Sequence, residues 1–270
     1  MTVINIDETM VSVPGGEIFV RRWHVSGGRC ETPVVLLHDS LGCVELWRDF
    51  PEVLALKLGR QVVAYDRLGF GRSTERTAPP SLRFIDEEAE SVFPALCASL
   101  GLEKVIPFGH SVGGCMAIAI ASIHSMTGLC AAVITESSQP YVEERTKRGI
   151  IASRNYFNQG NNFEKLAKYH GPKARWVLQA WTDTWLHPQF LCWNLKTHLN
   201  NVHCPILAVH GDRDEYGSVD FPEFIAGQAT GYSRSVVLPG IGHVPHKESC
   251  AEILDMVSGF LAESVEEGAL

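Results

Sequence analysis

The stretch that decides the fold is KVIPFGHSVGG, residues 104–114. Residues 104–108 are mostly apolar and predict a buried strand, whereas residues 112–125 have apolar side chains at helical spacing. Ser111 lies at the turn between them, flanked by Gly109 and Gly113. A sharp strand-to-helix turn leaves room only for small neighbours, and this turn projects the serine hydroxyl from the sheet. The stretch therefore predicts an α/β fold with a nucleophilic serine after a central strand.

Short apolar runs alternate with longer helical patterns on both sides of this stretch. Several runs are apolar on both faces, which is typical of parallel strands buried between helix layers and joined by right-handed crossovers. Strands are predicted at Ile18–Arg22, Val34–His38, Gln61–Tyr65, Lys104–Phe108, Ala131–Thr135, Ile206–His210 and Ser235–Leu238. Helices are predicted at Glu45–Lys57, Ile85–Leu100, Val112–Ser125 and Ser249–Leu261. We expect a mostly parallel central sheet flanked by helices.

One segment, residues 141–203, interrupts this alternation. It is more polar, lacks a buried strand and has helical patterns, and strands of the earlier character resume at Ile206. We therefore expect one core domain formed by residues 1–140 and 204–270, with residues 141–203 inserted as a helical cap. The cap carries four tryptophans that could either pack internally or line an aromatic pocket over the core, namely Trp176, Trp181, Trp185 and Trp193.

Composition and charge narrow the class of protein. The 270 residues are 45% hydrophobic and 20% charged, which is typical of a globular chain and not of a disordered one. A formal net charge of −8 disfavours a surface that binds phosphates, so no nucleic-acid partner is expected. We expect a small-molecule substrate as the partner, and self-association into a homodimer is left open.

The sequence gives no sign of a membrane segment, a secretory signal or a metal site. The weakly polar stretch 112–135 is broken by glycine, serine and histidine, and the N-terminus MTVINIDETM has no basic region before an apolar run. A cytoplasmic protein without a membrane partner is expected. The eight cysteines form no CxxC pair, so we expect mostly reduced core thiols, no zinc and no other cofactor.

A serine hydroxyl is a weak nucleophile at neutral pH, so it needs a histidine base and a carboxylate that orients the histidine. Asp214 follows the strand Ile206–His210 in HGDRDEYG, and His243 follows the last strand in PGIGHVPH. The order Ser111, Asp214, His243 is the order of nucleophile, acid and base in folds that carry such an elbow. We predict these three residues as the catalytic triad.

Alternatives exist for two of the three positions. Asp212 and Glu215 share the loop with Asp214, and Glu136 ends a neighbouring strand, so each of these carboxylates is a rival orienting group. His246 is the rival to His243, although its place after Pro245 at a helix start is more typical of a surface or capping histidine.

The oxyanion that forms during acyl transfer needs two backbone N–H donors. One is the N–H of Val112, directly after the nucleophile, at the start of a helix whose dipole favours negative charge. The second is expected from the loop HDSLG, residues 38–42, and by position we assign it to Ser40.

These motifs together resemble the α/β-hydrolase superfamily, in particular the small capped hydrolases that include esterases, enol-lactonases and meta-cleavage C–C hydrolases. The resemblance covers nearly the whole chain and rests on LLHDSLG (36–42), YDRLGFGRS (65–73), GHSVGG (109–114), HGDRDEYG (210–217) and GIGHVPH (240–246). It implies that Asp66 and Arg72 make structural hydrogen bonds. The sequence departs from the family at Asp39, where glycine is usual, which places a carboxyl group near the site entrance.

The function implied is hydrolysis of a small carboxylic ester or lactone through an acyl-enzyme on Ser111. One alternative is a C–C bond hydrolase of ring-cleavage products with the same triad. Such enzymes need cations for a substrate carboxylate, and the cap offers Arg148, Arg154 and Arg175. Another alternative is a non-catalytic ligand receptor on the same fold, because a fold alone does not fix function.

Overall fold

The computed structural model describes residues 3–27 and 30–266, and these residues form one eight-stranded sheet in the order β1-β2-β4-β3-β5-β6-β7-β8. β1 pairs with β2, and β2 with β4, in antiparallel fashion, while all other pairs are parallel. The predicted fold class, a mostly parallel sheet flanked by helices, is confirmed. The strands are β1 (Ile4–Val13), β2 (Gly16–Val25), β3 (Cys30–Leu37), β4 (Arg60–Tyr65), β5 (Ile106–His110), β6 (Val133–Glu136), β7 (Ile206–Gly211) and β8 (Ser233–Leu238).

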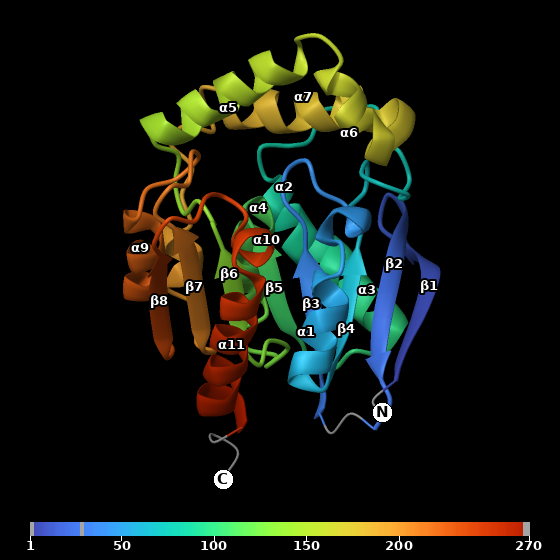
Figure 1. The fold of residues 1–270 in the computed structure, drawn as a ribbon, viewed down its shortest axis with the longest axis vertical. Coiled ribbons are helices and arrows are strands. Elements are labelled where there is room, and N and C mark those ends of the chain that lie inside the picture. The colour runs from blue at the N-terminus through green and yellow to red at the C-terminus, as the bar shows by residue number, and fades with distance from the viewer. Residues whose placement is uncertain (1–2, 28–29, 267–270) are drawn as a thin grey trace.

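Helices cover both faces of the sheet because the central strands are apolar on both faces. Val34 and Leu36 of β3 pack with α1 (Phe50–Leu58) and α11 (Cys250–Leu261) on one face, whereas Val35 and Leu37 pack on the other. Successive side chains of a strand point to opposite faces, so this alternation builds two cores. In Figure 1, α1 and α11 lie in front of the sheet, with α3 (Phe93–Leu100) and α4 (Val112–Ile123) behind it.

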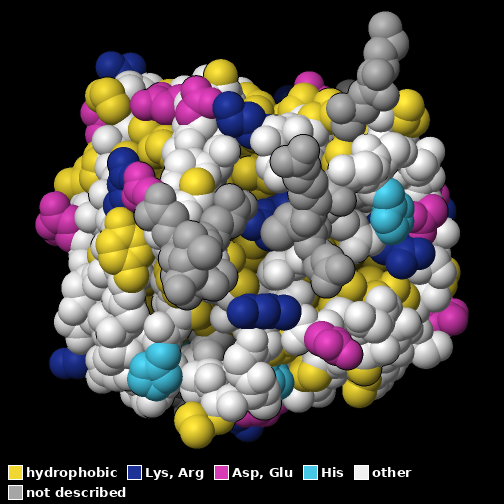
Figure 2. Space-filling view, turned by 90° about the horizontal axis from the view of Figure 1, so that it is seen from below, with side chains coloured by type: hydrophobic (Ala, Val, Ile, Leu, Met, Phe, Trp, Pro, Cys, Tyr) yellow, Lys and Arg dark blue, Asp and Glu magenta, His cyan; other side chains and the backbone are white. Residues whose placement is uncertain are grey.

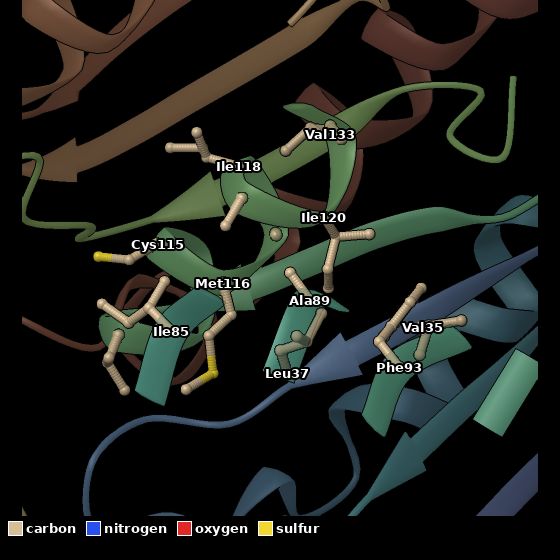
Figure 3. Close-up of a cluster of buried hydrophobic side chains, with 14 of the residues drawn as sticks. Val35, Leu37, Ile85, Ala89, Phe93, Cys115, Met116, Ile118, Ile120 and Val133 are labelled. Carbon is tan, nitrogen blue, oxygen red and sulfur yellow. The ribbon is translucent and has the colours of Figure 1, made fainter. Parts of the chain in front are cut away.

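Helix α4 lies at the centre of the second core. Every residue from Val112 to Ser122 is buried, as expected for a helix that is apolar all round. Figure 3 shows Met116 and Ile120 of α4 among Val35 and Leu37 of β3 and Phe93 of α3. The helix that follows Ser111 is therefore held from all sides, which fixes the position of its first turn.

Three helices lie across the carboxyl ends of the parallel strands (Figure 1): α5 (Glu144–Phe157), α6 (Asn162–His170) and α7 (Ala174–Trp185). His170 joins them to the core, since its Nδ1 accepts the Gly71 N–H at 3.0 Å and its Nε2 lies 3.0 Å from the Leu41 carbonyl oxygen. Lys173 donates to the carbonyl oxygens of Phe70 and Ser73. The loops after β3 and β4 are thereby bonded to these helices.

The chain after α7 packs differently. Phe190, Leu195, Leu199 and Val202 are buried in the same cluster as α4, and α8 (Lys196–Leu199) contacts α4 directly. Residues 186–203, which we predicted within the helical cap, thus include side chains that pack in the core. Helices α5, α6 and α7 lie across the carboxyl ends of the parallel strands.

Several elements differ from the sequence predictions. The edge strand β1 and the helix α9 (Asp220–Gln228) were not predicted, and the strand predicted at Lys104–Phe108 begins only at Ile106. The helix predicted at Glu45–Lys57 is broken at Arg48, whose φ is 58°, into η1 (Val44–Trp47) and α1. The helix predicted at Ile85–Leu100 consists of α2 (Phe84–Glu87), a wider π-type turn η2 (Glu88–Val92) and α3. The remaining short elements are η3 (Gly171–Lys173), α10 (Pro245–Glu248) and η4 (Ala262–Glu266).

The described cysteines, and the face of the molecule opposite α5, α6 and α7, are as expected for an ordinary globular protein. Seven described cysteines are free thiols and four of them are buried, while the side chain of Cys30 lies outside the described part. The face opposite α5, α6 and α7 mixes hydrophobic side chains with charges of both signs (Figure 2). None of the helices within residues 3–27 and 30–266 combines the length and the apolar character needed to cross a bilayer.

Candidate active site

Ser111 lies on a strained turn between β5 and α4, with φ of 56° and ψ of −124°. A non-glycine residue seldom adopts positive φ, so the surrounding packing must hold it there. A Cβ on Gly109 would lie 2.1 Å from the Gly113 carbonyl oxygen, and one on Gly113 would lie 2.0 Å from the Leu37 carbonyl oxygen. Both glycines are therefore required by close backbone approach, as the G-x-S-x-G pattern predicts.

Asp214 and His243 are brought together from the loops after β7 and β8. His243 Nδ1 lies 2.7 Å from Asp214 Oδ2, and the Tyr216 N–H donates to Asp214 Oδ1 at 2.7 Å. Asp214 is fully buried, and burial alone would raise its pKa. The rings of His243 and His210 and the Tyr216 N–H outweigh burial and hold the pKa of Asp214 below its ordinary value. The carboxylate is thus ionised and orients the His243 ring.

Ser111 and His243 line one small cavity beneath α5 and α7. Its volume is about 10 Å³, and its other walls are Ser40, Gln139, Thr146, Ile150, Trp181, Trp185 and Tyr216. Among the described side chains, Gln139 Oε1 accepts the Ser111 hydroxyl at 3.5 Å, and no hydrogen bond joins Ser111 to His243. Catalytic hydrogen bonds are often long or unformed without substrate. The cavity holds about one water molecule, so the substrate must extend beyond it.

Two of the rival residues, Glu136 and His246, pair with each other through their side chains and not with the side chains of the predicted triad. His246 Nδ1 lies 2.7 Å from Glu136 Oε2, and both side chains are buried. His246 packs against the rings of Trp47 and Phe50, and it lines a different cavity from that of Ser111. In the loop after β7, Asp212 accepts the Gly240 N–H, and Asp212 and Glu215 are both exposed.

His110 connects the loop of His243 with the loop after β3. Its Nε2 donates to the His243 carbonyl oxygen at 2.7 Å, and its Nδ1 lies 3.5 Å from Asp39 Oδ2. Burial lowers the pKa of His110, but Asp39, Glu136 and the His243 carbonyl oxygen outweigh burial, so its pKa is raised. The residue before the serine therefore positions the backbone of His243.

Asp39, whose carboxyl group we expected near the site entrance, lines the cavity that contains His246 and not that of Ser111. Its Oδ1 accepts the Leu41 N–H at 2.8 Å and its Oδ2 faces His110. A carboxylate that accepts a local N–H forms a compact turn, which explains why the loop accommodates Asp39 where glycine is usual. The predicted structural role of Asp66 is confirmed, since it accepts the N–H groups of Val44 and Arg72.

The two predicted oxyanion donors lie beside the serine. Ser40 lines the small cavity, and Val112 begins the helix directly after Ser111. Within the described residues, the N–H groups of Ser40 and Val112 have no protein acceptor, whereas the N–H of Leu41 is bonded to Asp39 and that of Gly42 to the Asp39 carbonyl oxygen. The N–H groups of Ser40 and Val112 are therefore among the unbonded donors near Ser111, and their role at the oxyanion stays a prediction.

A larger cavity of about 180 Å³ adjoins the small one and shares Ser40, Trp181 and Trp185 with it. Trp176 also lines the larger cavity, whereas Trp193 stacks on Phe190 in the core. The three cap arginines named above, Arg148, Arg154 and Arg175, line neither cavity. Sequence reasoning missed Arg67 and Glu88, which line the larger cavity, and the Tyr216 ring, 4.6 Å from that of His243. No sequence signal distinguishes Arg67 from a turn residue.

Among the described residues, no group of three or more His, Cys, Asp or Glu side chains is arranged to hold a metal ion.

The comparisons with known proteins place this geometry in a family. A family model described as alpha/beta hydrolase fold matches residues 32–173, about half of the chain, so the protein belongs to the alpha/beta hydrolase family. This confirms the resemblance seen in the motifs. The chain aligns with a quarter of the length of 1-acylglycerol-3-phosphate O-acyltransferase from Homo sapiens, at 39% identity over 95 residues and 33% of this chain.

Other similarities cover nearly the whole chain at lower identity. A non-heme haloperoxidase from Rhodococcus erythropolis is 23% identical over 93% of this chain and 97% of its own length. The structure of 2-hydroxy-6-oxo-6-phenylhexa-2,4-dienoate hydrolase from Rhodococcus sp. strain RHA1 matches with a TM-score of 0.77 and 18% identity, over 96% of this chain and 99% of that chain. An enol-lactonase from Burkholderia xenovorans LB400 matches with a TM-score of 0.70 and 18% identity, over 94% and 99%. At these identities, the solved structures establish the fold alone.

Proposed function

We propose that this alpha/beta hydrolase is a serine hydrolase that cleaves a small carboxylic ester or lactone through an acyl-enzyme on Ser111. The observation that carries the proposal is the convergence of Ser111, on its strained turn, with the Asp214–His243 pair at one cavity. The chemistry requires a nucleophile, a base and an orienting carboxylate in this relation.

Each step follows from the placement of the side chains. Asp214 binds His243 at Nδ1, so the other ring nitrogen, Nε2, accepts the proton of the Ser111 hydroxyl as Oγ attacks the carbonyl carbon. The N–H groups of Ser40 and Val112 stabilise the oxyanion. His243 then donates the proton to the departing alkoxide, and the ester C–O bond breaks to give the acyl-enzyme.

The second half-reaction regenerates the enzyme. A water molecule transfers a proton to His243 Nε2 and attacks the acyl carbon, and Ser111 Oγ departs with that proton. The products are a carboxylic acid and an alcohol, or a single hydroxy acid when the substrate is a lactone. The cavity of about 180 Å³ shares Pro80, Trp176 and Ala180 with a further cavity of about 500 Å³, so its own volume does not limit the substrate; the small space of about 10 Å³ beside Ser111 is what supports a small group at the scissile carbonyl.

Steady-state hydrolysis of p-nitrophenyl acetate and butyrate tests this function. We expect turnover by wild type and its loss in Ser111→Ala, while Ser153→Ala, which removes a hydroxyl bonded to Tyr216 outside the cavity, retains turnover. Turnover that persists in Ser111→Ala contradicts the proposal. Stoichiometric binding of esters without turnover by folded wild type favours the receptor alternative, and selective cleavage of a dienoate favours C–C hydrolysis.

A further inference from the structure

The mechanism on Ser111 gives no role to the larger cavity, which lies between α7 and the loop after β4. This cavity shares Ser40 with the small cavity and is also lined by Val112, so it opens beside both proposed oxyanion donors. His243 is absent from its lining among the described residues. Because His243 protonates the departing alcohol, the alcohol leaves on the side of His243. The larger cavity, which His243 does not line, is then the place for the acyl group.

Arg67 is the unusual residue of this cavity. Its side chain is 5% exposed, and neither Nε nor Nη1 has a hydrogen-bond partner among the described residues. Nε is inaccessible, so Nη1 is the unused donor that can reach the cavity. Its Nη2 donates to the Asp39 carbonyl oxygen at 2.8 Å, and the guanidinium lies 4.3 Å from the centre of the Phe70 ring. Within the described part of the chain, no carboxylate oxygen comes within 4.0 Å of this guanidinium. A buried cation with an unused donor is costly unless a ligand completes its bonding.

The other charged residues of the cavity leave this donor open. Glu88 is buried, and its Oε1 accepts the Tyr65 hydroxyl at 2.7 Å instead of an Arg67 N–H. Burial raises the pKa of Glu88, although the charge of Arg67 opposes the rise. Arg76 and Glu87, which carry opposite charges, are more exposed than the Arg67–Glu88 end of the cavity. The buried end of the cavity therefore offers an N–H donor on a cation.

We propose that Arg67 binds a carboxylate on the acyl group of the substrate, so that the substrate class is a small ester or lactone of a dicarboxylic acid. This inference rests on the proposed function of Ser111 and specifies its substrate. The scissile carbonyl lies at the N–H groups of Ser40 and Val112, and the distal carboxylate accepts hydrogen bonds from the guanidinium. The geometry suits arginine, whose planar donors match carboxylate oxygens.

Paired substrates that differ only in charge test this inference. Mono-p-nitrophenyl glutarate carries a free carboxylate, whereas methyl p-nitrophenyl glutarate is its neutral counterpart. A hydrogen bond to a charged group in a buried site corresponds to about 10- to 100-fold in kcat/KM. We therefore expect wild type to prefer the anionic ester over the neutral ester by about that ratio.

Arginine variants show whether Arg67 produces the preference. Arg67→Met is expected to bring the ratio of anionic to neutral ester close to one with turnover of the neutral ester retained, and Arg67→Lys is expected to retain part of the preference. Arg175→Met is the matched control, since Arg175 is exposed, contacts Asn158 and Phe163, and should keep the wild-type ratio. Thermal unfolding of each variant identifies loss of fold, in which case the wild-type ratio and the lysine variant decide.

Failure of this inference differs from failure of the proposed function. Equal kcat/KM for the two esters in wild type overturns the role of Arg67 while hydrolysis on Ser111 stands. Absence of turnover with both esters overturns the proposed function. Calorimetric binding to Ser111→Ala then supplies an independent readout: tighter binding of monomethyl glutarate than of dimethyl glutarate supports the carboxylate site, and equal or absent binding overturns it.

Discussion

Two histidine–carboxylate pairs among the described residues have their atoms 2.7 Å apart, His243–Asp214 and His246–Glu136, and we assign catalysis only to the first. Asp214→Asn and Glu136→Gln make the same chemical change in the two pairs and keep the side-chain volume. The account predicts that the first change removes turnover while the fold survives, and that the second lowers stability while turnover survives.

The effect of Asp214→Asn follows from the hydrogen bonds of the carboxylate. The Tyr216 N–H donates to Oδ1, so the oxygen of an asparagine takes this position and its NH₂ group faces His243 Nδ1. His243 must then carry its proton on Nε2, where it cannot accept the proton of Ser111. The wrong tautomer lowers kcat by about 10⁴, as in the general triad case, which corresponds to about 5.4 kcal/mol of activation free energy.

Glu136→Gln affects a pair outside the cavity of Ser111. The amide oxygen of a glutamine still accepts from His246 Nδ1, but its NH₂ group takes the place of Glu136 Oε1, which has no partner among the described residues. Because this position is unpartnered in wild type as well, the expected loss comes from replacing a carboxylate acceptor of the His246 N–H by a weaker amide acceptor, about 1 kcal/mol of unfolding free energy. We expect urea unfolding to show this loss, with kcat for p-nitrophenyl butyrate nearly unchanged. Retained turnover in Asp214→Asn with lost turnover in folded Glu136→Gln refutes the assignment.

Three further perturbations have distinct expected outcomes. Gly113→Ala places a methyl group 2.0 Å from the Leu37 carbonyl oxygen and should lower the free energy of unfolding by about 3 kcal/mol or more. Gly259→Ala in α11, whose methyl group meets no atom within 4 Å, should raise the free energy of unfolding by about 0.5–1 kcal/mol. Equal urea midpoints for the two variants count against the packing argument. Burial lowers the pKa of His170, so the neutral ring contributes stability above the ordinary pKa of about 6.5, and this contribution is lost as pH falls toward the folded-state value. The Tm difference between wild type and His170→Gln should therefore shrink between about pH 7.5 and pH 5. A constant Tm difference would falsify the role of the neutral ring. Trp181→Ala enlarges the space beside Ser111 and should raise kcat/KM for p-nitrophenyl hexanoate relative to acetate by about tenfold, while an unchanged ratio places the acyl chain elsewhere.

The buried strands could be predicted because their side chains are apolar on both faces, and this pattern depends on local sequence alone. β1 escaped prediction because it is a half-exposed edge strand, in which Ile6 and Met10 face solvent and polar residues alternate with them. The break at Arg48 and the π-type turn before Pro94 depend on how neighbouring helices pack, which periodicity does not encode.

The residues of the candidate site likewise fall into those that the sequence predicts and those that only the folded chain reveals. Ser111, Asp214 and His243 could be named because each follows a strand at a fixed point of a known chain order. Arg67 could not, because its significance arises from burial beside a cavity and from a donor without an acceptor, which are properties of the folded chain. Likewise, the contact of Asp39 with His110 joins two loops that are far apart in sequence.

The central claim is that Ser111 is an activated nucleophile, and covalent labelling by a fluorophosphonate measures this most directly. Intact mass spectrometry of wild type should show one adduct, peptide mapping should place it on Ser111, and Ser111→Ala should remain unlabelled. His243→Ala should label far more slowly, because the base that accepts the Ser111 proton is gone. An adduct on another residue, or no adduct on folded wild type, would contradict the account.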